Sequence, residues 1–138
     1  MKRLLVPCDG SESALRAVRH AASEWASAEI HLLHVIEPMT PITLSEAFSA
    51  RQLDDRFPPQ AAQALEPAIA VLEQAGARYS LHCHFGNPAT EIADYARASA
   101  CDAIVMGTRG RGVLANLVIG SVAMQVVKQV EIPVTLVK

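Results

Sequence analysis

The sequence predicts an α/β fold: a single domain in which helices cover both faces of a doubly wound parallel sheet. Short apolar runs alternate with longer segments of helical periodicity along the whole chain. The apolar runs show little polar–apolar alternation, which is typical of strands covered on both faces. The 138 residues, 51% of them hydrophobic, suffice for one ordinary core. One domain over residues 1–138 is therefore expected.

Each expected strand is a short apolar run bounded by turn residues. Pro7 follows the first run, Glu37-Pro38 the second and Gly86-Asn87-Pro88 the third. The fourth run leads into a glycine-rich loop, and the fifth begins after Ile132-Pro133. The expected strands span residues 4–6, 30–36, 78–85, 103–106 and 134–137.

The segments between these strands carry helix signals. Either Ser11 or Ser13 can cap the first helix. Pro67 lies inside the second helical pattern, where it either bends the helix or begins a new one. Residues 38–59 are punctuated by proline and allow one short helix over residues 44–53. The expected main helices span residues 12–27, 60–74, 88–99 and 122–129.

Two of the loops that follow strands carry residues suited to a binding site. Ligands of open α/β sheets bind at the carboxyl ends of the strands, where the strand order reverses. If the strand order is 3-2-1-4-5, the reversal lies between the first and fourth strands. The loops there are Pro7-Cys8-Asp9-Gly10-Ser11 and Gly107-Thr108-Arg109-Gly110-Arg111-Gly112. These two loops are expected to flank one site.

A glycine pattern links the fourth strand to the last helix. Gly107, Gly110, Gly120 and Ser121 form Gly-x-x-Gly-(nine residues)-Gly-Ser. Glycines let the backbone approach an anion, and the free N–H groups of a helix N-terminus point at it. The pattern therefore predicts a phosphate cradle; the alternative is a tight turn that only packs a helix. The lysine-containing P-loop pattern and a recognisable catalytic set are absent, so the chain is not expected to be a dedicated phosphoryl-transfer enzyme.

Composition argues against several classes of partner. The 12 basic and 14 acidic side chains give a net charge of −2, and only 4% of residues are aromatic, so nucleic-acid binding is not expected. No apolar run approaches the roughly 20 residues of a membrane span. Three cysteines without a close pair fit a reducing compartment. A cytoplasmic protein is expected.

Several polar residues allow more than one interpretation. His82-Cys83-His84 places two imidazoles on one face of a strand, too few for a metal site, and a solvated or hydrogen-bonded pair is favoured. Cys8 is either a small buried residue, which is favoured, or a redox-active thiol near a helix N-terminus. Asp9 either contacts a ligand or caps the first helix.

The chain resembles the universal stress protein family over nearly its whole length, least from residue 38 to residue 78. That family has a Rossmann-like sheet of order 3-2-1-4-5, related to the adenine nucleotide alpha hydrolases. Its members with the complete glycine motif bind ATP. The segments that carry the resemblance are Val6-Pro7-Cys8-Asp9-Gly10-Ser11, Leu32-Leu33-His34-Val35, Gly86-Asn87-Pro88-Ala89, residues 102–112 and Gly120-Ser121-Val122-Ala123.

The resemblance implies an ATP site at which Mg²⁺ or Mn²⁺ is bound through the phosphates. The glycines and the helix start would surround the ribose and phosphates. Asp9 would lie on the adenine and ribose side, and apolar side chains would form the walls for the base. The implied nucleotide contacts are Pro7, Cys8, Asp9, Val35, Met106, Gly107, Arg109, Gly110, Gly120, Ser121 and Val122.

The resemblance further implies a nucleotide-sensing regulatory protein of the stress response, with at most slow ATP hydrolysis and an unidentified protein partner. A nucleotide-independent interaction protein, or an ATP-using transferase or hydrolase, are the alternatives. Residues 134–137 form an apolar edge strand, which is a pairing hazard unless it is covered. Pairing with a second copy covers it, so a homodimer through residues 134–137 is expected, as in the family.

Overall fold

The structure is a computed structural model that describes residues 1–38, 57–109 and 119–138. The short helix expected over residues 44–53 and the glycine at position 110 lie outside these ranges. Within them, helices and strands alternate along the chain. The elements are β1 (Arg3–Pro7), α1 (Glu12–Glu24), β2 (Glu29–Ile36), α3 (Pro59–Ala75), β3 (Arg78–Phe85), α4 (Pro88–Ala98), β4 (Ala103–Gly107), α5 (Ser121–Gln129) and β5 (Val134–Val137).

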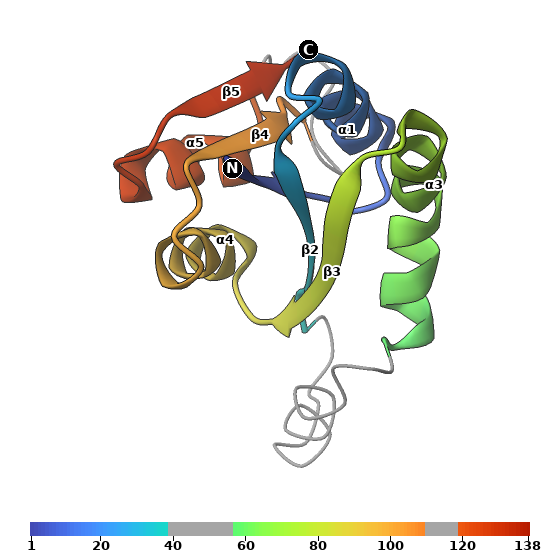
Figure 1. Cartoon of the computed structure of the whole chain (residues 1–138). Coiled ribbons are helices and arrows are strands. Elements are labelled where there is room, and N and C mark those ends of the chain that lie inside the picture. The colour runs from blue at the N-terminus through green and yellow to red at the C-terminus, as the bar shows by residue number, and fades with distance from the viewer. Residues whose placement is uncertain (39–56, 110–118) are drawn as a thin grey trace.

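The five strands form one parallel sheet in the order β3-β2-β1-β4-β5, as predicted. β1 lies at the centre, where Leu4 pairs with Ile30 on one side and with Ala103 on the other. The helices form a layer on each face: α1 and α3 cover one face, and α4 and α5 the other (Figure 1). The order reverses between β1 and β4, which places the loops after these strands side by side.

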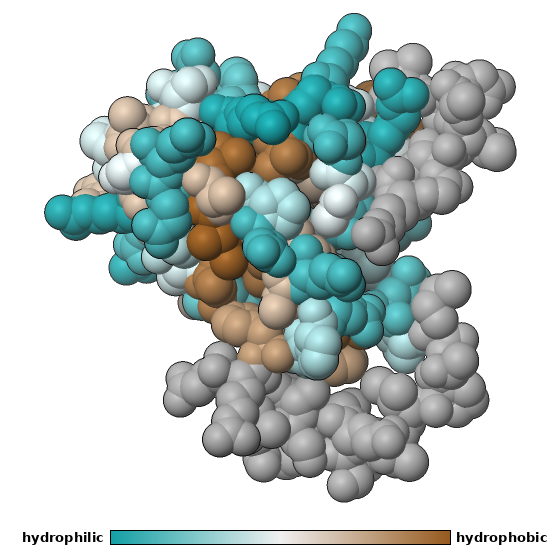
Figure 2. Space-filling model, turned by 90° about the vertical axis from the view of Figure 1, so that its right-hand side faces the viewer, coloured by the Kyte–Doolittle hydropathy of each residue, from teal (hydrophilic) through white to brown (hydrophobic). Residues whose placement is uncertain are grey.

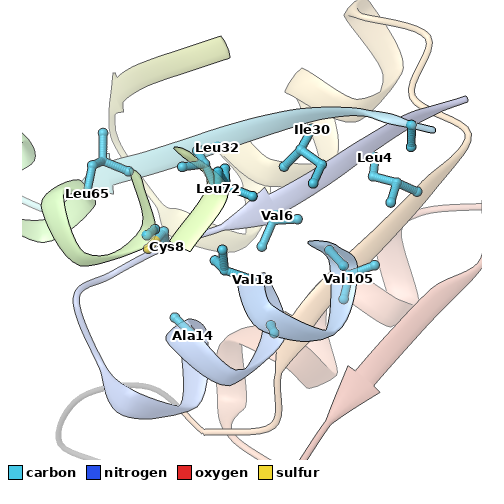
Figure 3. Close-up of a cluster of buried hydrophobic side chains, with 14 of the residues drawn as sticks. Leu4, Val6, Cys8, Ala14, Val18, Ile30, Leu32, Leu65, Leu72 and Val105 are labelled. Carbon is cyan, nitrogen blue, oxygen red and sulfur yellow. The ribbon is translucent and has the colours of Figure 1, made fainter. Parts of the chain in front are cut away.

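Aliphatic side chains fill both interfaces between the sheet and the helices. On the first face, Val18 of α1 lies beside Val6 and Val105 of the sheet, and Cys8 lies at the end of the cluster nearest α3 (Figure 3). On the other face, α4 and α5 bury Ile92 and Val126 against the sheet. This composition explains why the strands read as unbroken apolar runs.

The helices differ from the sequence expectation in two places. α3 is one 17-residue helix that continues through Pro67, so the alternative of a new helix beginning there is wrong. The ring of Pro67 is exposed, while Leu65 and Leu72 on the opposite side of the helix remain buried. α1 ends at Glu24, three residues earlier than predicted, because Trp25 leaves the helical conformation.

The side of the molecule formed by α1 and α3 is largely hydrophilic. Figure 2 shows this side, with a strip of hydrophobic residues among the polar ones. In the ranges that the structure describes, no helix combines the length and apolar character needed to cross a membrane.

Candidate functional site

A cavity with a volume of about 530 Å³ lies at the carboxyl ends of β1, β2 and β4. This is the location predicted from the strand order. Apart from Gly110, every residue predicted to contact a nucleotide lines this cavity. Those residues are Pro7, Cys8, Asp9, Val35, Met106, Gly107, Arg109, Gly120, Ser121 and Val122.

The turn after β1 is held in place by hydrogen bonds to β2 and to itself. The Cys8 N–H donates to the Leu33 carbonyl at 2.9 Å, and His34 Nδ1 lies 2.8 Å from the Cys8 carbonyl oxygen. Asp9 Oδ1 accepts the Ser11 N–H at 2.9 Å. The cap of α1 is Ser11, whose hydroxyl accepts a later N–H of the helix. Asp9 therefore orders the turn beside the cavity, and the interpretation of Asp9 as the helix cap is wrong.

His34 is a residue of this site that sequence reasoning did not identify. Because a carbonyl oxygen only accepts hydrogen bonds, His34 Nδ1 carries the proton that it shares with Cys8. The other ring nitrogen, Nε2, is buried and has no hydrogen-bond partner within the described part of the chain. The available signal was a histidine near the carboxyl end of a mostly apolar strand.

Cys8 is a buried packing residue rather than a reactive thiol. Its side chain is 4% exposed, and its Sγ lies 3.8 Å from the Ala64 carbonyl oxygen of α3. Burial raises the pKa of the Cys8 thiol from 9.0 to about 11. A redox-active cysteine requires a lowered pKa, so the redox interpretation is wrong.

The loop after β4 begins at a junction of three elements. The Thr108 N–H donates to the Val137 carbonyl of β5 at 3.1 Å, and the Thr108 carbonyl accepts the Gly120 N–H at the start of α5. The Arg109 N–H donates to the hydroxyl of Ser13 on α1 at 3.1 Å. Residues 108 and 109 thus connect α1, α5 and the edge strand.

Gly107 has a packing role that the glycine pattern alone did not reveal. A Cβ atom at this position would lie 2.6 Å from the Ser13 carbonyl oxygen and 2.7 Å from the Ser13 carbonyl carbon. Real Cβ atoms do not approach backbone atoms so closely. The structure therefore gives Gly107 a reason to be glycine that is independent of any ligand: the main chain of α1 lies against β4.

The start of α5 offers backbone donors to the cavity. Gly120 is the N-cap, and no side chain of the described residues caps the helix. The first intrahelical bond runs from the Met124 N–H to the Gly120 carbonyl, so the N–H groups before Met124 have no acceptor within the helix. Gly120, Ser121 and Val122 line the cavity. A helix N-terminus of this kind attracts anions.

Apolar side chains line other parts of the cavity. Val35 comes from β2 and Met106 from β4, as predicted. Pro88 and Ile92 come from the first turns of α4, and sequence reasoning had not placed them here. The signal available for them was the helix start at Asn87, whose side chain accepts the Thr90 N–H at 3.1 Å.

The histidines of β3 pack against α4 outside this cavity. His82 Nε2 lies 2.8 Å from the Ser80 hydroxyl, and the His82 ring stacks on His31 with centroids 5.4 Å apart. His84 Nδ1 lies 3.4 Å from a carboxylate oxygen of Glu91. The prediction of a hydrogen-bonded pair is right. In the described ranges, no three or more His, Cys, Asp or Glu side chains are grouped so that they could hold a metal ion.

Comparisons with known proteins agree with this geometry. The model of the universal stress protein family matches residues 1–138. A universal stress protein of Methanocaldococcus jannaschii is 31% identical over 140 residues, which cover 99% of this chain and 82% of that protein. The solved structure of hypothetical protein MJ0577 is 30% identical with a TM-score of 0.78, covering 99% of this chain and 95% of that one. A universal stress protein from Archaeoglobus fulgidus in complex with dAMP is 25% identical with a TM-score of 0.73, covering 100% and 98%. The chain belongs to the universal stress protein family.

Proposed function

We propose that this protein binds ATP in the cavity at the carboxyl ends of β1, β2 and β4, and acts as a nucleotide-sensing regulator of the stress response. The observation that carries the proposal is that the N-terminus of α5, which has no side-chain cap among the described residues, and several apolar side chains line the same cavity. The proposed contacts are the residues predicted from the sequence, with Gly110 among them.

The chemistry of the cavity fits the parts of an adenine nucleotide. Its volume of about 530 Å³ lies within the usual range for small-molecule sites. Val35 and Met106 offer apolar surface to a base, and the start of α5 offers N–H groups to phosphate. Asp9 suits hydrogen bonds from an amine or a ribose hydroxyl and repels phosphate. These preferences orient the nucleotide, with the base near β2 and the phosphates toward α5.

The related protein solved with dAMP supports an adenine nucleotide as the ligand. ATP extends this choice, because the sequence carries the complete pattern of Gly107, Gly110, Gly120 and Ser121 that the family resemblance links to ATP. A divalent cation, Mg²⁺ or Mn²⁺, would reach the site on the phosphates, since Mg²⁺ commonly binds through substrate phosphates and few protein ligands. We place the protein in the cytoplasm, acting on a protein partner that remains to be identified.

Regulation by binding, with at most slow hydrolysis, is the proposed mode of action. The described lining of the cavity offers one cationic side chain, Arg109, and no lysine. Fast phosphoryl transfer requires cations and a positioned water at the γ-phosphate. ATP incubated with the protein and Mg²⁺ should therefore release ADP or AMP only in trace amounts; turnover well above the protein-free rate would favour the alternative of an ATP-using enzyme.

Two calorimetric titrations test the proposed site, one with ATP and Mg²⁺ and one with adenosine. Wild-type protein should bind ATP, and absence of heat or of a thermal shift at millimolar ATP would exclude the proposal. Ser121→Asp puts a carboxylate in the first turn of α5, where it stabilises the helix but repels phosphate. ATP should then bind at least about tenfold more weakly, while adenosine binding stays unchanged.

Gln125→Asp is the matched control for this charge change. Gln125 is exposed, lies on the same helix and does not line the cavity. The control should leave both affinities close to those of the wild type. Equal loss of ATP affinity in both variants would mean that net charge, rather than the helix start, is responsible.

We further propose that two copies of the chain pair through β5. β5 lies at the edge of the sheet and pairs with β4 alone in the described sheet. The carbonyls of Pro133 and Val137 accept N–H groups of Ile104 in β4 and of Thr108 directly after it, so by alternation the backbone groups of Leu136 face the free edge. Sedimentation at micromolar concentration should show a dimer. Leu136→Pro removes an outward N–H and should yield a folded monomer; a wild-type monomer would refute the proposal.

A further inference from the structure

We propose that Ser13 is a positioning residue for the phosphate-binding loop: its hydroxyl anchors the beginning of that loop to α1. The inference rests on the proposed nucleotide site and assigns a role to a residue that does not line the cavity. Ser13 lies in the first turn of α1, two residues after the cap Ser11 and four after Asp9. It therefore connects the two loops that flank the site.

The environment of Ser13 is buried and close-fitting. Its side chain is only 5% exposed, although serine is usually a surface residue. The hydroxyl accepts the Arg109 N–H at 3.1 Å, and the main chain of Ser13 lies against the Cα of Gly107. Gly107 permits the approach, and the hydroxyl then satisfies the backbone group that this approach buries.

The bond from Arg109 to Ser13 differs from the other bonds at this junction. Thr108 is held through its backbone, by the carbonyl of Val137 and the N–H of Gly120. Only main-chain atoms take part in those two bonds, so a side-chain substitution leaves them in place. The third bond ends on a side chain and fixes Arg109, the last described residue before position 110. A substitution at Ser13 therefore releases the Arg109 N–H from α1 without changing any residue of the loop.

The consequence for binding concerns the phosphates rather than the base. Arg109 lines the cavity, and a main-chain segment that is already held loses less conformational entropy when it contacts a ligand. Without the Ser13 hydroxyl, the cost of ordering Arg109 falls on the binding of a ligand that contacts it, which we expect of the phosphates. A ligand without phosphates does not contact it and should bind as before.

Ser13→Ala separates these two effects when ATP and adenosine are titrated in parallel. The lost hydrogen bond should weaken ATP binding about fivefold and leave adenosine binding unchanged. Ser23→Ala, in the last turn of the same helix, is the control, because the Ser23 hydroxyl bonds back to the His20 carbonyl far from the loop. It should change neither affinity. A variant that is merely less well folded loses both affinities by the same factor, and that result would overturn the proposal.

Amide hydrogen exchange in the ligand-free protein tests the anchor independently of any nucleotide. The Arg109 N–H should exchange faster in Ser13→Ala than in the wild type, while exchange of the Thr108 N–H changes less. If the wild type binds no nucleotide but Arg109 responds in this way, the proposed function fails and the anchor stands. Unchanged exchange at Arg109 would overturn the anchor.

A second pair of variants removes the same bond from its other end. Arg109→Pro deletes the donor N–H, and Arg109→Ala keeps it while removing the side chain. If Ser13→Ala fails to fold, Arg109→Pro should still bind ATP about fivefold more weakly than Arg109→Ala, with equal affinity for adenosine. Equal ATP affinities in the two Arg109 variants would overturn the proposal.

Discussion

A single methyl group at position 107 tests how closely the sheet approaches α1. In Gly107→Ala, the new Cβ would lie 2.6 Å from the Ser13 carbonyl oxygen and 2.7 Å from its carbonyl carbon. Overpacking of this kind costs typically about 1 to 3 kcal/mol. The atom nearest to this Cβ is the Ser13 hydroxyl oxygen, which can rotate away, but the Ser13 carbonyl atoms belong to the main chain of a helix and cannot. We therefore expect a value of about 2 to 3 kcal/mol.

Urea unfolding followed by the fluorescence of Trp25, the single tryptophan of the chain, measures this cost. Each kcal/mol should also lower the melting temperature by about 2 to 4 °C in a domain near this size. Gly76→Ala is the control: Gly76 has φ of +67°, and nothing lies within 4 Å of its Cβ position. It should lose only the conformational advantage of glycine, about 1 kcal/mol.

The result that would refute the reasoning is a Gly107→Ala variant no less stable than Gly76→Ala. A second outcome is equally informative. Adding Ser13→Gly to Gly107→Ala removes the hydroxyl but leaves the carbonyl group in place, so stability should not be recovered. Recovery would mean that the side chain of Ser13, rather than its main chain, excludes a Cβ at position 107.

Two further predictions concern buried polar groups. The Cys8 thiol has a pKa of about 11 in the folded protein and 9.0 in the unfolded chain, so the free energy of unfolding should fall by up to about 3 kcal/mol as the pH rises from 9 toward 11. Urea titrations at several pH values measure this fall, and Cys8→Ala should reduce it. The same pH dependence in Cys8→Ala and wild type would contradict the raised pKa. Tyr95→Phe leaves the buried Nδ1 of His31 without the hydroxyl 2.7 Å away and should cost about 1 to 3 kcal/mol of stability. ATP affinity should not change, because Tyr95 does not line the cavity; a loss of affinity would show coupling between α4 and the site.

The sheet could be predicted because its strands are short apolar runs with turn residues at their ends. The order of the strands followed from the family resemblance and from the alternation of strands and helices. The C-terminal end of α1 and the continuity of α3 through Pro67 could not be predicted, because packing of the buried face decides them. Local propensity alone treats Pro67 as a breaker, whereas its exposed ring leaves the packed face of α3 intact.

The cavity could be located from the sequence, since its lining follows strand ends that the topology brings together. The residues that hold the site from outside could not. Ser13 meets Arg109 across 96 positions, and only the packing of α1 on β4 brings them together. His34 likewise bonds to a main-chain carbonyl, so its residue type shows a polar group in the strand but not the partner of that group. Sequence patterns identify residues that line a cavity more readily than they identify the residues that hold that lining in place.

The central place of β1 in the sheet has a consequence for the order in which the protein is made. β1 and α1 leave the ribosome early, but their neighbour β4 is encoded about a hundred positions later. At typical elongation rates, Arg109 is synthesised about 5 to 20 s after Ser13. During that time one side of the central strand is open to other chains, so the nascent protein is most vulnerable to aggregation before its nucleotide loop exists. A ligand of the proposed site could therefore assist folding only after β4 and α5, which line the cavity, have been made.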